Sequence, residues 1–330
     1  MGNHEIKLID WLLLNSKQAG ISLQRHDWTD KYIFGLQHIT AELTQFSGRK
    51  IAGSGKDWTE EGAIQKAVAE LAERLAWSSS NEETTNGFAA HIDVDRAQRA
   101  SFRELLERDL FLGHWFSGLP LSQINWRERL WLTKSGKRIL KALDHEDLTA
   151  FKFFCGYTLK CSGLRCIAAA AYHPVHGIHI SLALEDDMNE AIEKCFLEII
   201  HNCIYKLSSV MSAISLPDFL ALTTVNVDDH RKLSCDPVYS NIAIKRMFFS
   251  DVSYTLSNAE VLLPEVKTSQ IRIEHPFSDA PLVVCRSYSV EMQNLFFGSD
   301  WKNILSARVN MFNQSIYSDG IGSPIPHPLV

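Results

Sequence analysis

The sequence predicts an α/β fold of the α+β kind, in which helices pack on a mixed β-sheet. Residues 60–77 and 187–210 have the apolar periodicity of amphipathic helices. Short apolar runs at 151–154, 166–172, 178–184, 269–275 and 281–290 predict strands. Because the chain has 330 residues and is 45% hydrophobic, it can bury a sizeable core, and we expect a single domain over 1–330.

The first sixty residues give weaker signals. Residues 4–15 predict a short amphipathic helix, and 32–36 and 41–44 are candidate strands. Gly53-Ser54-Gly55-Lys56 follows. It lacks the full G-x-x-x-x-G-K-[S/T] pattern, so we interpret it as a flexible turn before a helix. Such a turn could still contact phosphate through its backbone N–H groups and Lys56.

The next segments are easier to delimit. Thr59 is a candidate N-cap for the helix at 60–77, although Gly62 stands where a capping box needs an acid or amide. Asn86-Gly87 predicts a turn, and Asp93 or Asp95 can cap a helix that ends near 116. The basic and aromatic segment 126–131 is either a surface helix or strand, or a patch that contacts peptide. Residues 216–259 predict no definite element.

The most informative feature is a pattern that occurs twice. Glu70-Leu71-Ala72-Glu73-Arg74 recurs 34 residues later as Glu104-Leu105-Leu106-Glu107-Arg108. On a helix, Glu at i and i+3 share one face, with the Arg beside them. Two such helices packed together would need a cation to neutralise four carboxylates, and oxygen ligands favour Mg²⁺ completed by nucleotide phosphates. The alternative is two amphipathic helices with ordinary surface charge.

The composition indicates which kinds of partner and which cellular compartment to expect. The net charge of −6 gives no general signal for nucleic acid or membrane, and no apolar run reaches the length of a membrane span. The seven cysteines are irregularly spaced, which is typical of a reduced cytoplasmic protein with buried thiols. In the helix at 187–210, Lys194, Glu198 and His201 share a face and could add to a polar cleft, unless this face is simply solvated.

The chain ends in alternating prolines. Pro324, Pro326 and Pro328 force an extended, stiff segment without internal hydrogen bonds. A stiff tail can occupy a groove at low entropic cost and deliver the Val330 carboxylate to a definite place. A simple chain end or a proline-rich ligand for a partner is the alternative.

These motifs together resemble the YcaO family of ATP-dependent enzymes. The family's S-x-x-E-x-x-E-R motif reads here as residues 67–74, and its S-N-G-x-A-A-G region and following E-x-x-E-R-D read as 85–91 and 104–109. Its R-x-x-x-E-x-x-Q helix corresponds to the spacing of Lys194, Glu198 and His201. The chain departs from these motifs at Ala67, Thr85, His91, Lys194 and His201, which affects the expected nucleotide contacts more than the metal site.

The resemblance implies roles for individual residues. It implies a YcaO-like fold whose helices carry an acidic Mg-ATP cleft, with motifs at 53–116 and 187–202 and a proline-rich tail at 324–330. The implied Mg²⁺ ligands are Glu70, Glu73, Glu104, Glu107 and Glu198. The implied nucleotide-binding residues are Arg74, Arg108 and Lys194, with Asn86 of the turn and Lys56 as further candidates. The P-x-P-x-P ending is similar to that of azoline-forming members, and the Val330 carboxylate is the candidate catalytic base, positioned by Pro324, Pro326 and Pro328.

The resemblance also implies a reaction and partners. Azoline-forming members cyclise Cys, Ser or Thr of a ribosomally made precursor peptide, using ATP to activate the amide oxygen. Members of this size usually work with a leader-binding partner that resembles ubiquitin-activating enzymes, and some add a flavin-dependent dehydrogenase. The alternatives are thioamide or amidine formation, a non-catalytic scaffold, and a helical-repeat module. No third copy of the 34-residue spacing supports the last of these.

Overall fold

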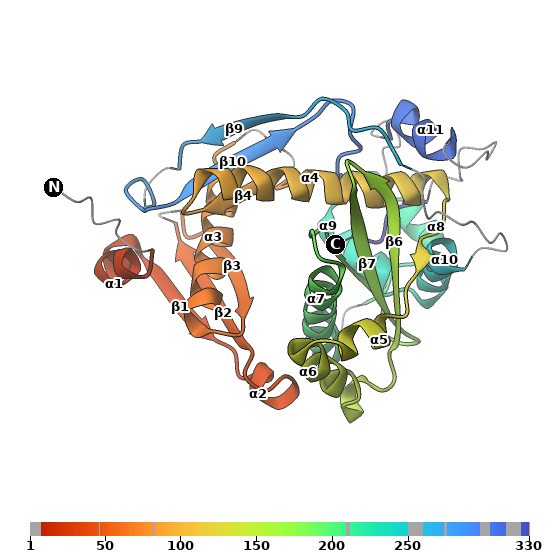
Figure 1. The fold of residues 1–330 in the computed structure, drawn as a ribbon, viewed down its shortest axis with the longest axis horizontal. Coiled ribbons are helices and arrows are strands. Elements are labelled where there is room, and N and C mark those ends of the chain that lie inside the picture. Colours follow the sequence, from red (N-terminus) through yellow and green to blue (C-terminus); the bar gives the residue numbers. More distant parts are fainter. Residues whose placement is uncertain are drawn as a thin grey trace. The chain divides into compact units, whose positions relative to one another are not determined.

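The computed structural model describes residues 8–45, 47–80, 82, 84–208, 212–249, 260–273, 276–297, 304–314 and 325–329. The chain forms two compact units. The first comprises residues 1–105 and 266–289, and the second comprises 106–265 and 290–330. Each is described separately below (Figure 1). Our expectation of one domain over 1–330 stays a prediction.

The first unit contains two antiparallel three-stranded sheets, in the orders β1-β2-β3 and β4-β10-β9. The strands are β1 (Ile21–Arg25), β2 (Gln37–Thr44), β3 (Lys50–Asp57), β4 (Phe88–His91), β9 (Lys267–Ile271) and β10 (Val283–Tyr288). The helices are α1 (Leu8–Ala19), α2 (Trp28–Tyr32), α3 (Glu60–Ser78) and the start of α4 (Val94–Ser117). α3 packs along β2 and β3 (Figure 1).

The second unit is built on the antiparallel sheet β5-β6-β7-β8. Its strands are β5 (Ser122–Gln123), β6 (Lys152–Cys161), β7 (Leu164–His173) and β8 (Gly177–Ala183). Its helices are the rest of α4, α5 (Trp126–Trp131), α6 (Lys134–Leu143), α7 (Met188–Ser208), α8 (Leu216–Leu220), α9 (Val227–Ser234), α10 (Pro237–Phe248) and α11 (Ser306–Gln314). A short 3-10 helix, η1, spans Glu146–Leu148. α7 packs on β7 and β8, beside α6 (Figure 1).

The α+β class is confirmed, and so are the strongest elements. α3 begins after Thr59, whose hydroxyl accepts a hydrogen bond from the Gly62 amide at 3.1 Å. The apolar periodicity predicted for residues 60–77 corresponds to a stripe on α3, in which Ala67, Val68 and Leu71 are buried in the core of the first unit. α4 begins beside Asp93, which accepts from the Arg96 amide at 2.8 Å.

Two predictions for the first unit are wrong. Residues 32–36 are not a strand, since α2 ends at Tyr32 and a turn follows. Residues 53–56 are not a flexible turn, because they lie inside β3, with Gly53 opposite Ala41 and Gly55 opposite Ile39. These two glycines are needed because α3 lies against them. A Cβ on Gly53 would stand 2.2 Å from the Ala67 carbonyl oxygen.

Smaller differences concern boundaries and missed elements. The first helix runs to Ala19, and its predicted start at residue 4 lies outside the described residues. The segment 216–259, for which the sequence predicted no definite helix or strand, contains α8, α9 and α10. No helix among the described residues has the length and apolar composition needed to span a membrane. All seven cysteines are buried and free of disulfides.

Candidate nucleotide and magnesium site

Glu70 of α3 is held in place by two groups of the first unit. Its carboxylate accepts hydrogen bonds from the Ser54 amide of β3 at 2.6 Å and from the Arg74 guanidinium at 2.5 Å. Arg74 also donates to the Ala52 carbonyl oxygen at 2.6 Å. Arg74 therefore ties α3 to β3 and orients the carboxylate, which is one of the two uses that the motif allows for this arginine.

Glu73 lies one turn further along α3, and its charge is poorly compensated. It accepts a hydrogen bond from the Ala90 amide of β4 at 2.7 Å. Burial raises the pKa of Glu73 well above its ordinary value, and the nearby negative charges of Glu104 and Glu70 raise it further. A carboxylate in this position is favoured when a cation is bound beside it.

The second copy of the motif lies on α4, which passes from the first unit into the second at Leu105. Burial raises the pKa of Glu107, and the charge of Glu185 adds to this, while Arg108 and Lys194 oppose it. The Arg108 guanidinium is 3.9 Å from the Glu107 carboxylate. Within the second unit, Glu107 is thus a second partly buried acid, 15% exposed, among charged neighbours.

The α7 residues of the third motif are partly engaged with neighbours. The Lys194 ammonium forms a short ion pair with Glu185 and lies 3.7 Å from a carboxylate oxygen of Glu190. The Glu198 carboxylate lies 3.9 Å from the Nδ1 atom of His201. The helical spacing therefore brings Lys194, Glu198 and His201 to one face, as predicted.

Glu185 is a residue that sequence reasoning missed. It influences Glu107 and pairs with Lys194, so it belongs to the polar residues of the second unit. The available signal was the acidic run Glu185-Asp186-Asp187, which follows the predicted strand at 178–184 directly. Such a run usually indicates a solvated loop or a helix cap, and nothing in it distinguishes the first acid.

Two further predicted nucleotide contacts lie in the first unit. Lys56 is on β3, where its carbonyl oxygen accepts a hydrogen bond from the Lys66 ammonium at 3.1 Å. Asn86 is buried and precedes Gly87, which has a φ of +78°. A Cβ on Gly87 would stand 2.2 Å from the Ser287 carbonyl oxygen, so this turn must contain glycine where it meets β10.

The described end of the tail is buried in the second unit. The Ile325 carbonyl oxygen accepts from the Trp115 indole at 2.9 Å, and the Pro326 carbonyl oxygen accepts from the Tyr239 hydroxyl at 2.5 Å. The His327 ring hydrogen-bonds the Phe296 carbonyl oxygen at 2.5 Å and stacks on His230. Pro328 and Leu329 are buried, whereas Pro324 and Val330 lie outside the described residues.

The tail and the second motif belong to the same unit. Burial lowers the pKa of His327 to about 3, and the positive charge of Arg108 contributes to this decrease. The charge of Arg108 in the second motif is therefore felt electrostatically at His327 of the tail.

The donor set fits a hard cation that other ligands complete. The candidate residues present carboxylate oxygens, which Mg²⁺ prefers, together with arginine and lysine side chains suited to phosphate. Within the described ranges, no three His, Cys, Asp or Glu side chains are arranged to hold a metal by themselves. This is compatible with Mg²⁺, which usually keeps water and phosphate oxygens among its ligands.

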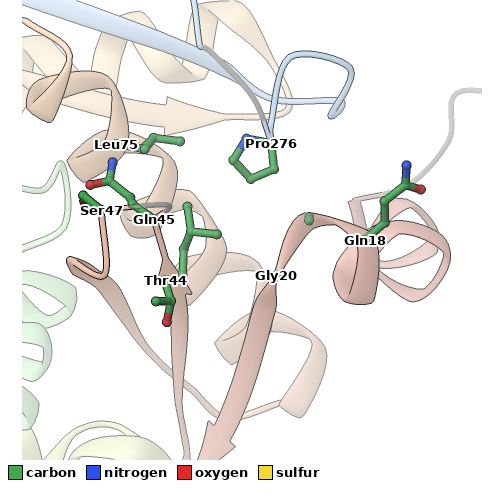
Figure 2. Close-up of a pocket in the computed structure, with 9 residues that line it drawn as sticks. Gln18, Gly20, Thr44, Gln45, Ser47, Leu75 and Pro276 are labelled. Atoms are coloured by element: carbon green, nitrogen blue, oxygen red, sulfur yellow. The ribbon is translucent and has the colours of Figure 1, made fainter.

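A pocket of about 520 Å³ in the first unit is separate from these residues. Figure 2 shows Gln18 of α1, Gly20 between α1 and β1, Leu75 of α3 and Pro276 around it. None of its lining residues carries a formal charge, and none is a predicted site residue. It is therefore unsuited to a triphosphate.

Acidic helices whose partly buried carboxylates have basic neighbours are compatible with binding of a divalent metal and a nucleotide. Residues 69–234, half of the chain, match the family model described as YcaO cyclodehydratase, which binds ATP and Mg²⁺. The chain belongs to the YcaO family, and ATP and Mg²⁺ are its cofactors.

Solved structures agree with this fold. The YcaO protein of Methanopyrus kandleri, bound with AMPPCP and Mg²⁺, is similar at a TM-score of 0.57 and 11% identity, over 86% of this chain and 89% of that one. A heterocyclase in complex with substrate and cofactor is similar at 0.53 and 12%, over 83% of this chain and 50% of that one. A search of curated protein sequences gave no match.

Proposed function

We propose that this protein is a cyclodehydratase subunit that converts Cys, Ser or Thr residues of a ribosomally made precursor peptide to thiazolines or oxazolines. Membership of the YcaO family supports ATP-dependent chemistry. The burial of residues 326–329 is the observation that favours azoline formation within the family. A simple chain end has no need of the hydrogen bonds that Trp115 and Tyr239 make to the tail.

The proposed reaction needs ATP because amide oxygen is a poor leaving group. The peptide's side-chain thiol or hydroxyl attacks the preceding carbonyl carbon, and the oxygen of this adduct receives the γ-phosphoryl group. This transfer releases ADP, and the later loss of phosphate and of the amide proton forms the C=N bond of the azoline. Bound Mg²⁺ would neutralise charge on the phosphoryl group.

The chain's own residues would bind and orient these reactants. The proposed Mg²⁺ ligands are Glu70, Glu73 and Glu104 of the first unit and Glu107 and Glu198 of the second. Burial leaves two of them, Glu73 and Glu107, poorly compensated without a cation, which supports this proposal. Among the basic residues, Arg108 and Lys194 are the proposed phosphate contacts, with Lys56 and Asn86 as further candidates. Arg74 would act by orienting Glu70, to which it is hydrogen-bonded.

The terminal carboxylate is the proposed proton acceptor. In the tail, the carbonyl oxygens of Ile325 and Pro326 are fixed by hydrogen bonds from Trp115 and Tyr239 of the second unit. Pro324, Pro326 and Pro328 would hold it extended, so that the Val330 carboxylate reaches the attacking side chain or orients it.

The proposed partners follow from this function. The substrate would be a precursor peptide, presented by a leader-binding protein that resembles ubiquitin-activating enzymes, and a flavin-dependent dehydrogenase would oxidise azolines to azoles. We propose that the assembly works in the cytoplasm. Buried free thiols are compatible with such a reducing compartment.

Lengthening the tail tests the role of the terminal carboxylate separately from the role of the other tail residues. Two glycines added after Val330 leave the contacts of residues 325–329 intact but displace the terminal carboxylate. We expect the variant to fold and bind nucleotide normally while heterocycle formation, measured as loss of one water per ring by mass spectrometry, falls by at least about 100-fold. A Val330→Leu variant, which retains the carboxylate, is the matched control and should stay active.

Two outcomes would contradict the proposal. Full activity of the lengthened variant would remove the role of the carboxylate. A gain in peptide mass, from replacement of oxygen by sulfur, would show thioamide formation instead.

A further inference from the structure

A strongly basic surface lies on α5 and α6 of the second unit. Six basic residues and one acid occupy 126–141, although the whole chain has a net charge of −6. We call this set the α5–α6 basic surface; it consists of Arg127, Arg129, Lys134, Lys137, Arg138 and Lys141. The proposed reaction does not use any of them.

The fold keeps the lysines of this surface outward. Ile139, Leu140 and Leu143 of α6 are buried, while Lys134, Lys137 and Lys141 are exposed. Among the described residues, none forms an ion pair with Lys134, Lys141 or Arg129. The Arg127 guanidinium is 3.3 Å from Asp144, which compensates its charge in part. Most of the positive charge is therefore left uncompensated by the fold.

α6 is also held rigidly. Thr133 caps it by accepting from the Gly136 amide at 2.9 Å. Thr133 and Ser135 both donate to the Glu193 carboxylate of α7, the latter at 2.6 Å. A rigid arrangement of charges loses little entropy when a ligand binds. Because Glu193 precedes Lys194, the surface is anchored to the helix that carries the third motif.

Apolar groups and a pocket adjoin the charges. Trp131 and Leu132 are each 63% exposed, and the Lys137 ammonium lies 5.3 Å from the centre of the Trp131 ring. Leu132, Arg129 and Met188 help to line a pocket of about 490 Å³. Gln123 and Asn125 also line it. Their amide nitrogens donate to the Phe248 carbonyl oxygen and to Glu128, and their amide oxygens can accept from a peptide backbone.

We propose that the α5–α6 basic surface and this pocket bind an acidic segment of the precursor peptide, whose apolar side chain enters the pocket. Charge complementarity identifies the occupant, since exposed lysines in a row favour carboxylates. The exposed Trp131 and Leu132 beside the lysines suit a peptide with acidic and apolar side chains better than a continuous phosphate backbone. The inference rests on the proposed function only in assigning the acidic segment to the substrate.

The test measures binding and does not require turnover. The probe is a short fluorescein-labelled peptide of Glu, Gly and Leu, and its affinity for the full chain is measured by fluorescence anisotropy. We expect binding that weakens as salt is raised. Lys134→Glu, Lys137→Glu and Lys141→Glu together should weaken it by at least about tenfold. Trp131→Ala should weaken binding without changing its salt dependence.

The controls separate this surface from general charge effects. Lys17→Glu, Lys31→Glu and Lys245→Glu change the net charge equally at exposed positions elsewhere, and should change affinity less than about twofold. A probe with Gln for Glu should bind weakly to every variant. The proposal is wrong if the two triple variants behave alike, if the Gln probe binds equally well, or if only duplex DNA or phosphatidylserine vesicles respond to the α6 substitutions.

Failure of this inference is distinguishable from failure of the proposed function. If the wild-type complex makes no azolines but the α6 variant loses the acidic probe, the docking surface stands and the reaction does not. If azolines form and the α6 variant retains both probe affinity and the substrate KM, the reaction stands and the surface does not.

Discussion

Replacing Gly53 by alanine tests how β3 and α3 position the acidic residues of the first unit. A Cβ at this position would stand 2.2 Å from the Ala67 carbonyl oxygen and 2.3 Å from the Leu71 amide nitrogen. Both are backbone atoms of α3, which cannot rotate away. To restore an ordinary contact of 3.4 Å, the helix must move by about 1.2 Å.

A movement of this size would disturb the site as well as the core. The Ser54 amide donates to Glu70 at 2.6 Å, and an additional 1.2 Å would break this hydrogen bond. Glu73 and Arg74 lie on the same helix and would move with it. We expect the free energy of unfolding to fall by about 3 kcal/mol or more, and ATP turnover by roughly 100-fold.

The measurements are urea unfolding followed by circular dichroism, and ATP hydrolysis with the peptide substrate. Gly48→Ala is the matched control. Gly48 has a φ of +80°, and no heavy atom lies within 4 Å of its Cβ position. That variant should lose only the roughly 1–2 kcal/mol of a strained left-handed residue and keep its activity. If the two variants unfold at the same urea concentration and hydrolyse ATP equally, the close approach of α3 is not what positions the acids.

Two other predictions concern buried titratable groups. His114 is buried and accepts a hydrogen bond from the Leu159 amide at 2.8 Å, and burial lowers its pKa to about 4. Because the unfolded chain binds this proton more readily, acidification destabilises the folded state. Lowering the pH from 6.5 to about 4 should reduce the free energy of unfolding by about 3 kcal/mol. His114→Gln should flatten this part of the profile in unfolding experiments from pH 4 to 7, and an unchanged slope would refute the assignment. Glu73→Gln keeps an acceptor for the Ala90 amide but removes a poorly compensated charge, so the unliganded protein should become more stable by roughly 0.5–2 kcal/mol. Mg²⁺-dependent nucleotide binding, measured by calorimetry, should be abolished. Tighter binding would contradict the metal assignment.

Sequence analysis predicts a helix or strand most accurately where the element's own residues identify its buried face. The stripe of Ala67, Val68 and Leu71 defines α3 without knowledge of its partner. Gly53 and Gly55 are different, because a glycine-rich run suggests a turn until the helix that requires the missing Cβ atoms is known. The α+β class was therefore predictable, whereas the strand β3 was not.

In the candidate site, too, residues defined by local spacing were predictable, whereas residues brought together by distant parts of the chain were not. Repetition of the motif identified Glu73 and Glu107, because helical spacing is local. Glu185 could not be found in this way, since its pairing with Lys194 joins a strand end to a helix. The contacts of the tail with Trp115 and Tyr239 are equally non-local. The prolines predicted an extended tail but not which residues would receive it.

The buried acids also distinguish the hypotheses for the repeated motif. On ordinary surface helices, the carboxylates would be solvated and their pKa values close to the usual ones. Burial raises the pKa of Glu73 and of Glu107, which belong to different copies of the motif. Unliganded, such groups reduce stability. Binding of a cation would offset this loss, so the arrangement is better explained by a metal site than by ordinary surface charge.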